Sequence, residues 1–285
     1  MKYLQLFALF IFISSCCSTK RITESSSDKP KTEVIEITKD SITTEIETTT
    51  EIEPPKPPKI VEVDVVDDYT PEAFNHYSWN ILLKKYVTNS GNVNYKGFKS
   101  NRKELTNYIT SLSKNIPNDT WSNQDKLAYW INAYNAMTID LILRHYPVKS
   151  IKDIKKPWNL RYWKLGEKWY NLNEIEHNIL RKMNEPRIHF AIVCASFSCP
   201  KLLNKAFRSE NIDNQLTKVT REFLSDSNRN EISQNNIKLS KIFQWFAKDF
   251  KQDGSLIDFL NTYSEITISA KAKKSFKDYN WKLNE

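Results

Sequence analysis

All eight tryptophan residues of this chain lie beyond residue 68, and no aromatic residue occurs between residues 18 and 67. That stretch is rich in Thr, Glu, Ser and Pro. A segment of this composition cannot bury enough apolar surface to offset the conformational entropy lost on folding. We therefore predict a disordered tether over residues 16–67 and a single folded domain over residues 68–285, which is long enough for one hydrophobic core.

The first fifteen residues have the features of a secretory signal. Lys2 precedes an apolar run over residues 4–13, which is too short to span a bilayer as a helix. The run ends in Ile13-Ser14-Ser15-Cys16, a pattern that resembles the lipobox of bacterial lipoproteins. The resemblance implies a signal peptide over residues 1–15 that is cut before Cys16, whose thiol then carries lipid. An ordinary secretory signal with chance cysteines is the alternative.

Location and charge narrow the possible partners. No acidic cluster follows Cys16, so we expect a cell-envelope protein that is lipid-anchored in the outer membrane and faces the periplasm. The chain carries a net charge of +8 although residues 18–67 are acidic, so the domain is strongly basic. It could attract an acidic envelope component or a protein partner, whereas the expected location argues against nucleic acid. The alternative is that the excess lysine only keeps the domain soluble.

Periodicity predicts an α+β fold, a mostly helical single domain with a small sheet and short hairpins. Expected helices cover residues 71–87, 101–113, 122–145, 173–183, 208–225, 241–250 and 255–263, with another opening at Pro200. Ser122 and Asp125 form a capping box before the longest of them. Expected strands are a hairpin over residues 163–169 that turns near Gly166, a buried strand over residues 187–195, and a second hairpin that pairs residue 232 with residues 237–239.

Several motifs in this order resemble one known family, the domain of unknown function family 547. They are WINAYNA at residues 130–136, YPVKSI at 146–151, IEHNILR at 175–181, RIHFAIVCASFSCP at 187–200, LSKIFQW at 239–245 and YNWKLN at 279–284. The resemblance implies a widespread domain that is often lipid-anchored or secreted in bacteria. It implies no reaction, so the chemistry has to come from the residues.

Two cysteines in the fourth motif are candidate nucleophiles. Cys194 lies at the end of the expected strand, and Cys199 precedes Pro200 at the start of an expected helix, whose dipole would stabilise a thiolate. Along an ideal strand, His189 and Cys194 would point to opposite faces. All four histidines precede both domain cysteines, which is not the order of a papain-like enzyme.

The remaining candidates lie on two expected helices. His177 is the expected base, with Glu176 or Glu174 orienting its ring. Asn132 and Asn135 share one helix face, where they could buttress a histidine or donate to an oxyanion. The candidate catalytic set is therefore Cys194, Cys199, His177, Glu176, His189, Asn132 and Asn135.

Other interpretations of these residues stay open. Cys194 and Cys199 could be inert core thiols or a disulfide, and His177 with Glu176 could be a structural pair. The absence of CxxC and HxxxH spacing argues against zinc, and four glycines leave little room for a phosphate loop, so we expect no metal and no cofactor. The sequence thus favours two functions: a Cys-dependent hydrolase or acyltransferase acting on an amide or ester, or a non-catalytic envelope binding domain.

Overall fold

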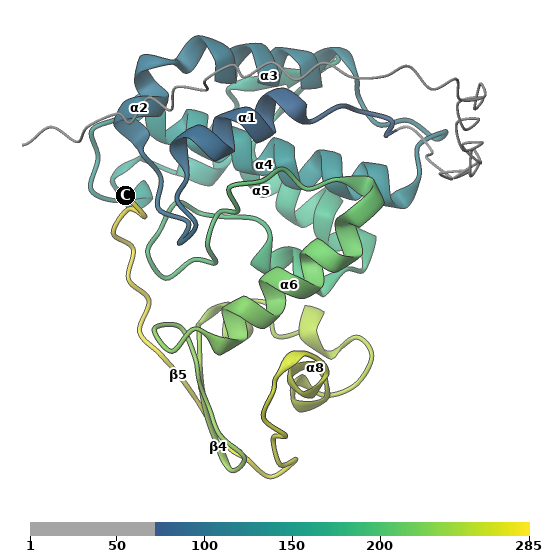
Figure 1. Cartoon of the computed structure of the whole chain (residues 1–285), viewed down its shortest axis with the longest axis vertical. Helices are drawn as coiled ribbons and strands as arrows, with labels where there is room; N and C mark the ends of the chain where they lie inside the picture. The colour runs from purple at the N-terminus through teal and green to yellow at the C-terminus, as the bar shows by residue number, and fades with distance from the viewer. Residues whose placement is uncertain (1–71) are drawn as a thin grey trace, which may run out of the picture. The chain divides into compact units, whose positions relative to one another are not determined.

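The computed structural model describes residues 72–285 of the chain (Figure 1). The expected signal peptide 1–15, the lipidation site Cys16 and the tether 16–67 lie outside the described residues. Helices dominate the described part: α1 Tyr77–Tyr86, α2 Tyr95–Ser100, α3 Arg102–Lys114, α4 Asn123–His145, α5 Leu172–Glu174, α6 Ile212–Ser225, α7 Ile242–Trp245 and α8 Leu256–Tyr263.

The strands form two small sheets, which confirms the expected α+β class. They are β1 Trp163–Leu165, β2 Lys168–Tyr170, β3 Glu231–Ile232, β4 Asn236–Leu239 and β5 Lys273–Phe276. β1 and β2 form an antiparallel hairpin around Gly166, whose φ of +55° suits the turn. β3 and β4 form the second expected hairpin, and β5 adds to β4 in parallel.

Helix α4 is the centre of the domain. Its N-terminus is capped because the Ser122 hydroxyl accepts a hydrogen bond from the Asp125 N–H at 3.0 Å. The sequence predicts one wide apolar face, but every residue from Leu127 to Leu143 is buried. The helix is covered all round because α2, α3, α6 and the segment 172–183 pack against it. Polar residues on α4 therefore need partners inside the protein.

The second half of the domain is built around α6. In Figure 1, α6 leads from the helices around α4 towards β4, and β4 and β5 lie side by side below it. The chain then returns from β5 to the first helices, where Val93 N–H donates to the Asn284 carbonyl at 2.7 Å. This return brings residues 279–284 against the RIHFAIVCASFSCP motif.

Two local predictions are wrong. Residues 187–195 are not a strand: the chain forms a 3₁₀ turn at Pro186–Phe190 and then runs irregularly. No helix opens at Pro200, and the next turn begins at Ser209. A short buried apolar run has no periodicity that separates a strand from other buried segments, and Pro186 favours the first position of a helical turn. The sequence analysis also missed α2 and β5.

Candidate active site

The segment that carries the two cysteines is held in place by Asn135 on α4. The Asn135 side chain donates to the Ala191 carbonyl at 2.9 Å and accepts from the Val193 N–H at 3.0 Å. These bonds satisfy buried backbone groups that a sheet would otherwise pair. Ala195 then turns the chain with a φ of +57°, a left-handed conformation that is uncommon for a residue other than glycine. The Cys194 side chain therefore sits at a sharp, fixed bend.

Cys194 and Cys199 are both free thiols in direct contact. The Cys194 N–H donates to Cys199 Sγ at 3.0 Å, and Cys194 Sγ lies 3.1 Å from Ser196 Oγ and 3.3 Å from Tyr279 OH. Hydrogen bonds from Cys199, Ser196 and Tyr279 together lower the pKa of Cys194 to about 7, although burial opposes them. Burial raises the pKa of Cys199. Cys194 is thus the thiol that ionises near neutral pH.

Tyr279 comes from the returning C-terminal segment, 85 residues away from Cys194 in the sequence. The segment is fixed beside the cysteine loop because Phe197 N–H donates to the Lys282 carbonyl at 2.7 Å and Ser198 N–H donates to the Asn280 carbonyl at 3.2 Å. The sequence analysis did not single out Tyr279 or Ser196. Only the YNWKLN ending pointed to this part of the chain.

His189 is oriented by a carboxylate that the sequence analysis missed. Its Nε2 lies 2.8 Å from Asp249 Oδ2, and its ring stacks on Phe246 with a centroid distance of 4.0 Å. Burial lowers the pKa of His189, and hydrogen bonds from Arg181 and His189 hold the pKa of Asp249 well below its usual value despite burial. The neutral His189 ring therefore donates through Nε2 to Asp249 and keeps a lone pair on Nδ1.

His177 is linked to the same carboxylate through Arg181. The guanidinium binds Asp249 through two hydrogen bonds of 2.6 and 2.7 Å, and its Nη1 donates to His177 Nδ1 at 2.7 Å. Burial and the neighbouring Arg181 lower the pKa of His177. Since Nδ1 accepts this hydrogen bond, the ring carries its proton on Nε2 and is a donor there, not the base expected from the sequence.

The two glutamates have different surroundings. Glu176 is buried, and its Oε2 accepts from Tyr134 OH at 3.0 Å. Burial raises the pKa of Glu176 to about 7, so this carboxyl is about half protonated at neutral pH. Glu174 instead forms ion pairs with Arg161, at 2.7 Å, and with Lys168. Glu174 therefore orients no histidine.

The side chains of Asn132 and Asn135 bind backbone groups, and neither belongs to the wall of the cavity that Cys194 borders. Asn132 donates to the Phe207 carbonyl at 2.7 Å and accepts from the Phe207 N–H at 3.0 Å. Asn135 makes the equivalent pair of bonds to the cysteine segment. The structure thus corrects the expectation of oxyanion support, because both amides serve buried loops that have no sheet to pair with.

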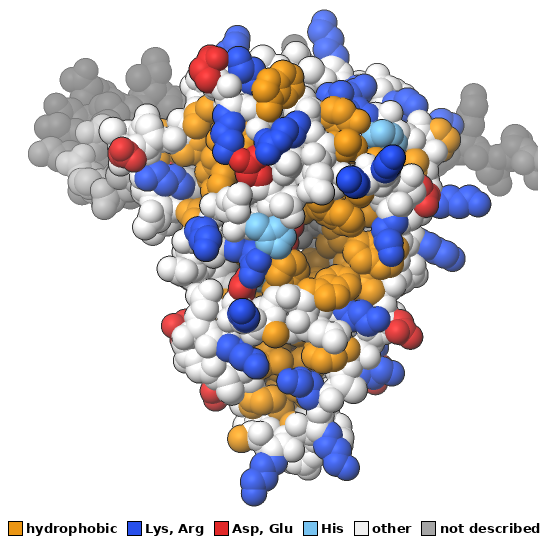
Figure 2. Space-filling view, turned by 180° about the vertical axis from the view of Figure 1, so that it is seen from behind, with side chains coloured by type: hydrophobic (Ala, Val, Ile, Leu, Met, Phe, Trp, Pro, Cys, Tyr) orange, Lys and Arg blue, Asp and Glu red, His pale blue; other side chains and the backbone are white. Residues whose placement is uncertain are grey.

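One cavity of about 320 Å³ collects the other candidates, namely Glu176, His177, His189, Cys194 and Cys199. His189 and Cys194 border it together because the chain between them is not a strand. His177 is hydrogen-bonded to Arg181 and His189 to Asp249, so neither imidazole is paired with Cys194. The face in Figure 2 is hollowed where hydrophobic side chains and a histidine meet. A larger cavity, about 800 Å³ between α6 and the β3–β4–β5 sheet, has no cysteine or histidine in its wall.

Residues 72–285 contain neither a cluster of metal-binding side chains nor a helix that could span a membrane. No cluster of three or more His, Cys, Asp or Glu side chains in this range is arranged to hold a metal ion. Every helix in the same range is too short or too polar to cross a bilayer.

These features define a class of protein: an α+β domain in which two free thiols, two histidines and a carboxyl of raised pKa line a single cavity. Residues 118–224 match the model of the family described as "Protein of unknown function, DUF547". The match confirms the resemblance drawn from the motifs in that range. No curated protein and no solved structure matches the chain.

Proposed function

We propose that the domain is a cysteine-dependent hydrolase or acyltransferase that acts on an amide or ester, with Cys194 as its nucleophile. One observation carries the proposal: the thiol with the lowered pKa borders the cavity that also holds His189, His177 and Glu176. A thiolate that is already populated near pH 7 needs no base to attack a carbonyl. This accounts for the observation that Cys194 Sγ contacts the hydroxyl groups of Ser196 and Tyr279 and not an imidazole.

The remaining groups fit the two halves of such a reaction. In the first, the Cys194 sulfur bonds to the carbonyl carbon, the carbon–nitrogen or carbon–oxygen bond breaks, and protonated Glu176 gives its proton to the leaving group. In the second, neutral His189 takes a proton from water or another acyl acceptor, whose oxygen or nitrogen bonds to the acyl carbon as the carbon–sulfur bond breaks and Cys194 leaves as the thiolate. Asp249 would stabilise the imidazolium that forms, as the third member of a triad does.

Alkylation kinetics test this function. Iodoacetamide labelling followed across pH should give a Cys194 midpoint near 7, with Cys199 much slower. Tryptic digestion separates both from Cys16 and Cys17, and tandem mass spectrometry resolves the two within peptide 188–201. A simple 4-nitrophenyl ester should leave an acyl group on Cys194, which Cys194→Ser abolishes. Slow, equal labelling of both thiols and no acyl adduct would instead support the non-catalytic envelope binding domain.

We also propose that the mature protein is lipid-anchored through Cys16 in the cell envelope, on the periplasmic face of the outer membrane. The lipobox-like sequence before Cys16 supports the anchor. Two or more acyl chains on one residue hold a protein stably at a membrane. Cell fractionation tests the anchor. The Cys16→Ser protein should no longer be found in the membrane fraction, whereas the Cys17→Ser protein should remain there. Equal behaviour of the two variants would contradict the anchor.

A further inference from the structure

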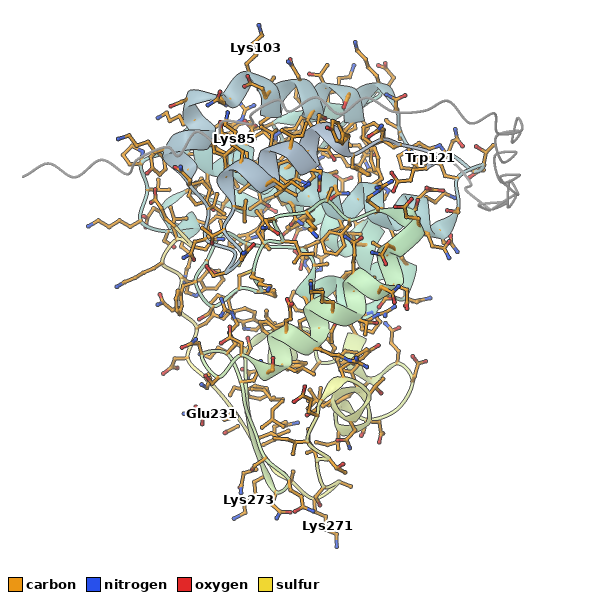
Figure 3. All side chains as sticks on the ribbon, in the orientation of Figure 1. Lys85, Lys103, Trp121, Glu231, Lys271 and Lys273 are labelled. Carbon is orange, nitrogen blue, oxygen red and sulfur yellow. The ribbon has the colours of Figure 1, made fainter. Side chains whose placement is uncertain are left out.

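The cavity beside Cys194 has an unusual wall for so basic a domain. Among the described residues, none of the side chains that line it is Lys or Arg. Figure 3 shows the labelled Lys103 pointing outward from α3, and Lys271 and Lys273 pointing outward at the opposite end of the view. The positive charge of the domain therefore lies outside the cavity, and no Lys or Arg side chain in the wall would form an ion pair with a carboxylate or phosphate.

Aromatic rings form one side of the same cavity. The ring of Trp281 lies 4.5 Å from Tyr279, 5.8 Å from Trp245 and 6.0 Å from Trp158, measured between centroids. Trp245 is 46% exposed although it borders the cavity, so the described chain leaves nearly half of its surface uncovered. One ammonium group, on Lys152, lies 5.1 Å from the Trp281 ring centre in a cation–π contact, but Lys152 is not part of the wall.

The polar groups of the cavity lie together with the thiol. Cys194, Glu176 and His189 supply the reacting end, whereas Trp158, Trp245 and Ile242 supply an apolar surface. Ligand sites combine a mostly apolar wall with a few polar groups that fix orientation. A volume of about 320 Å³ lies at the small end of such sites, so it has room for a compact group such as one or two fused rings.

We propose that this cavity selects an uncharged aromatic acyl group, which packs against Trp245 and Trp281 and places its carbonyl at Cys194, and that it rejects anionic groups. Aromatic rings gain from edge and offset packing against one another beyond the area that they bury. An anion in this cavity would lose its hydration and find no cation in the wall, with the Cys194 thiolate nearby. The inference rests on the proposed thiol chemistry only for the position of the carbonyl.

Binding to the full-length Cys194→Ser protein tests the cavity without any reaction. The probes are 1-naphthaleneacetamide, its carboxylate analogue 1-naphthaleneacetate, and acetamide, followed by calorimetry or ligand-observed NMR. We expect the naphthyl amide to bind at least tenfold more tightly than the carboxylate, and acetamide to show no binding. Equal or tighter binding of the carboxylate would overturn the inference.

Two matched tryptophan variants, each made in the Cys194→Ser protein, locate the binding. Trp245→Ala should weaken naphthyl amide binding at least fivefold. Trp169→Ala should leave it unchanged, because Trp169 is 51% exposed on β2 and does not border the cavity. Thermal unfolding checks that both variants are folded. An equal effect of the two would place the ligand elsewhere and overturn the inference.

Acylation of the wild-type protein separates this inference from the proposed function. The probes are the 4-nitrophenyl esters of naphthaleneacetic acid and acetic acid, whose carbon–oxygen bond breaks as the Cys194 sulfur–carbon bond forms and 4-nitrophenolate leaves. If the naphthyl amide binds but neither ester acylates Cys194, the cavity inference stands and the proposed function falls. If both esters acylate Cys194 at equal rates, the function stands and the inference falls.

Discussion

The Cys194 backbone N–H donates to the Sγ of Cys199 at 3.0 Å, and the hydrogen bond with Cys199 is the largest of the interactions that lower the pKa of Cys194. The two thiols therefore have different roles. Cys199 is 4% exposed, and burial raises its own pKa, so it stays protonated and supports its neighbour. Cys194, with its pKa lowered to about 7, is the thiol of the pair that ionises at the cavity.

Removing the Cys199 thiol should make Cys194 a weaker acid. In Cys199→Ala we expect the midpoint of Cys194 alkylation to move from about 7 towards its ordinary value of 9.0. A rise of one pH unit would cut the thiolate fraction at pH 7 from about one half to about one tenth, and the alkylation rate with it. Cys199→Ser keeps a donor at this position and should lie between the two. An unchanged midpoint in Cys199→Ala would show that Cys199 does not tune the thiol.

Asp249 should stabilise the fold at neutral pH and lose this effect in acid. The carboxylate binds both Arg181 and His189, so Asp249→Asn should lower the free energy of unfolding by about 2–4 kcal/mol at pH 7. Its folded-state pKa is depressed, so the stabilisation is present above the unfolded value near 3.8 and declines as pH falls through the folded value. Urea unfolding at pH 7 and at about pH 2 measures the difference.

An exposed aspartate supplies the control for that comparison. Asp278 pairs with Lys241 at 3.6 Å on the surface, where ion pairs contribute little. Asp278→Asn should leave stability unchanged at both pH values. A stability loss in Asp249→Asn that stays the same at pH 7 and in acid would contradict a role for the charge.

Helix starts and turns that depend on local residues could be predicted from the sequence. Ser122 marks the start of α4, Gly166 marks the β1–β2 turn, and α8 lies within the expected range 255–263. Helical spacing around His177 predicted a regular helix, but the chain forms a π-helical stretch at Ile175–Ile179 that departs from that spacing. Local periodicity cannot report such a change, because the packing of this segment against α4 decides it.

The cavity itself depends on contacts between distant residues. Five of the seven expected catalytic residues do line one cavity, since the motifs that carry them pack on α4. Tyr279 adds to its wall from 85 residues away from Cys194, and Asp249, 60 residues away from His189, orients that histidine. A lone Asp before Phe250 and a Tyr near the C-terminus have no spacing that marks them as site residues. The buried run at residues 187–195 was misleading because side-chain hydrogen bonds from Asn135 replace the ladder of a sheet.

Glu176 should make the fold less stable as pH rises through neutrality. Its pKa is about 7 in the folded protein and 4.5 unfolded, so between these values the folded state binds more protons. Stability is therefore full below about pH 4.5 and declines towards pH 7, by about 2–3 kcal/mol from this group. Glu176→Gln keeps an acceptor for Tyr134 OH and should remove this decline. Comparing wild type and variant by urea unfolding from pH 5 to pH 8 isolates the effect from that of the histidines. Parallel stability curves for the two proteins would contradict it.

Asn132 and Asn135 make the same kind of contact in different places, which allows a matched comparison. Each alanine substitution leaves a buried backbone N–H and carbonyl without partners, so both should lose about 2–4 kcal/mol of stability. Only Asn135→Ala should also slow Cys194 alkylation, because Asn135 fixes the chain directly before Cys194.

The measurement is the rate of Cys194 alkylation in Asn132→Ala and Asn135→Ala, at a denaturant concentration where both variants stay folded. Equal labelling of Cys194 in the Asn132→Ala and Asn135→Ala variants would mean that the amide stabilises the domain without positioning its thiol.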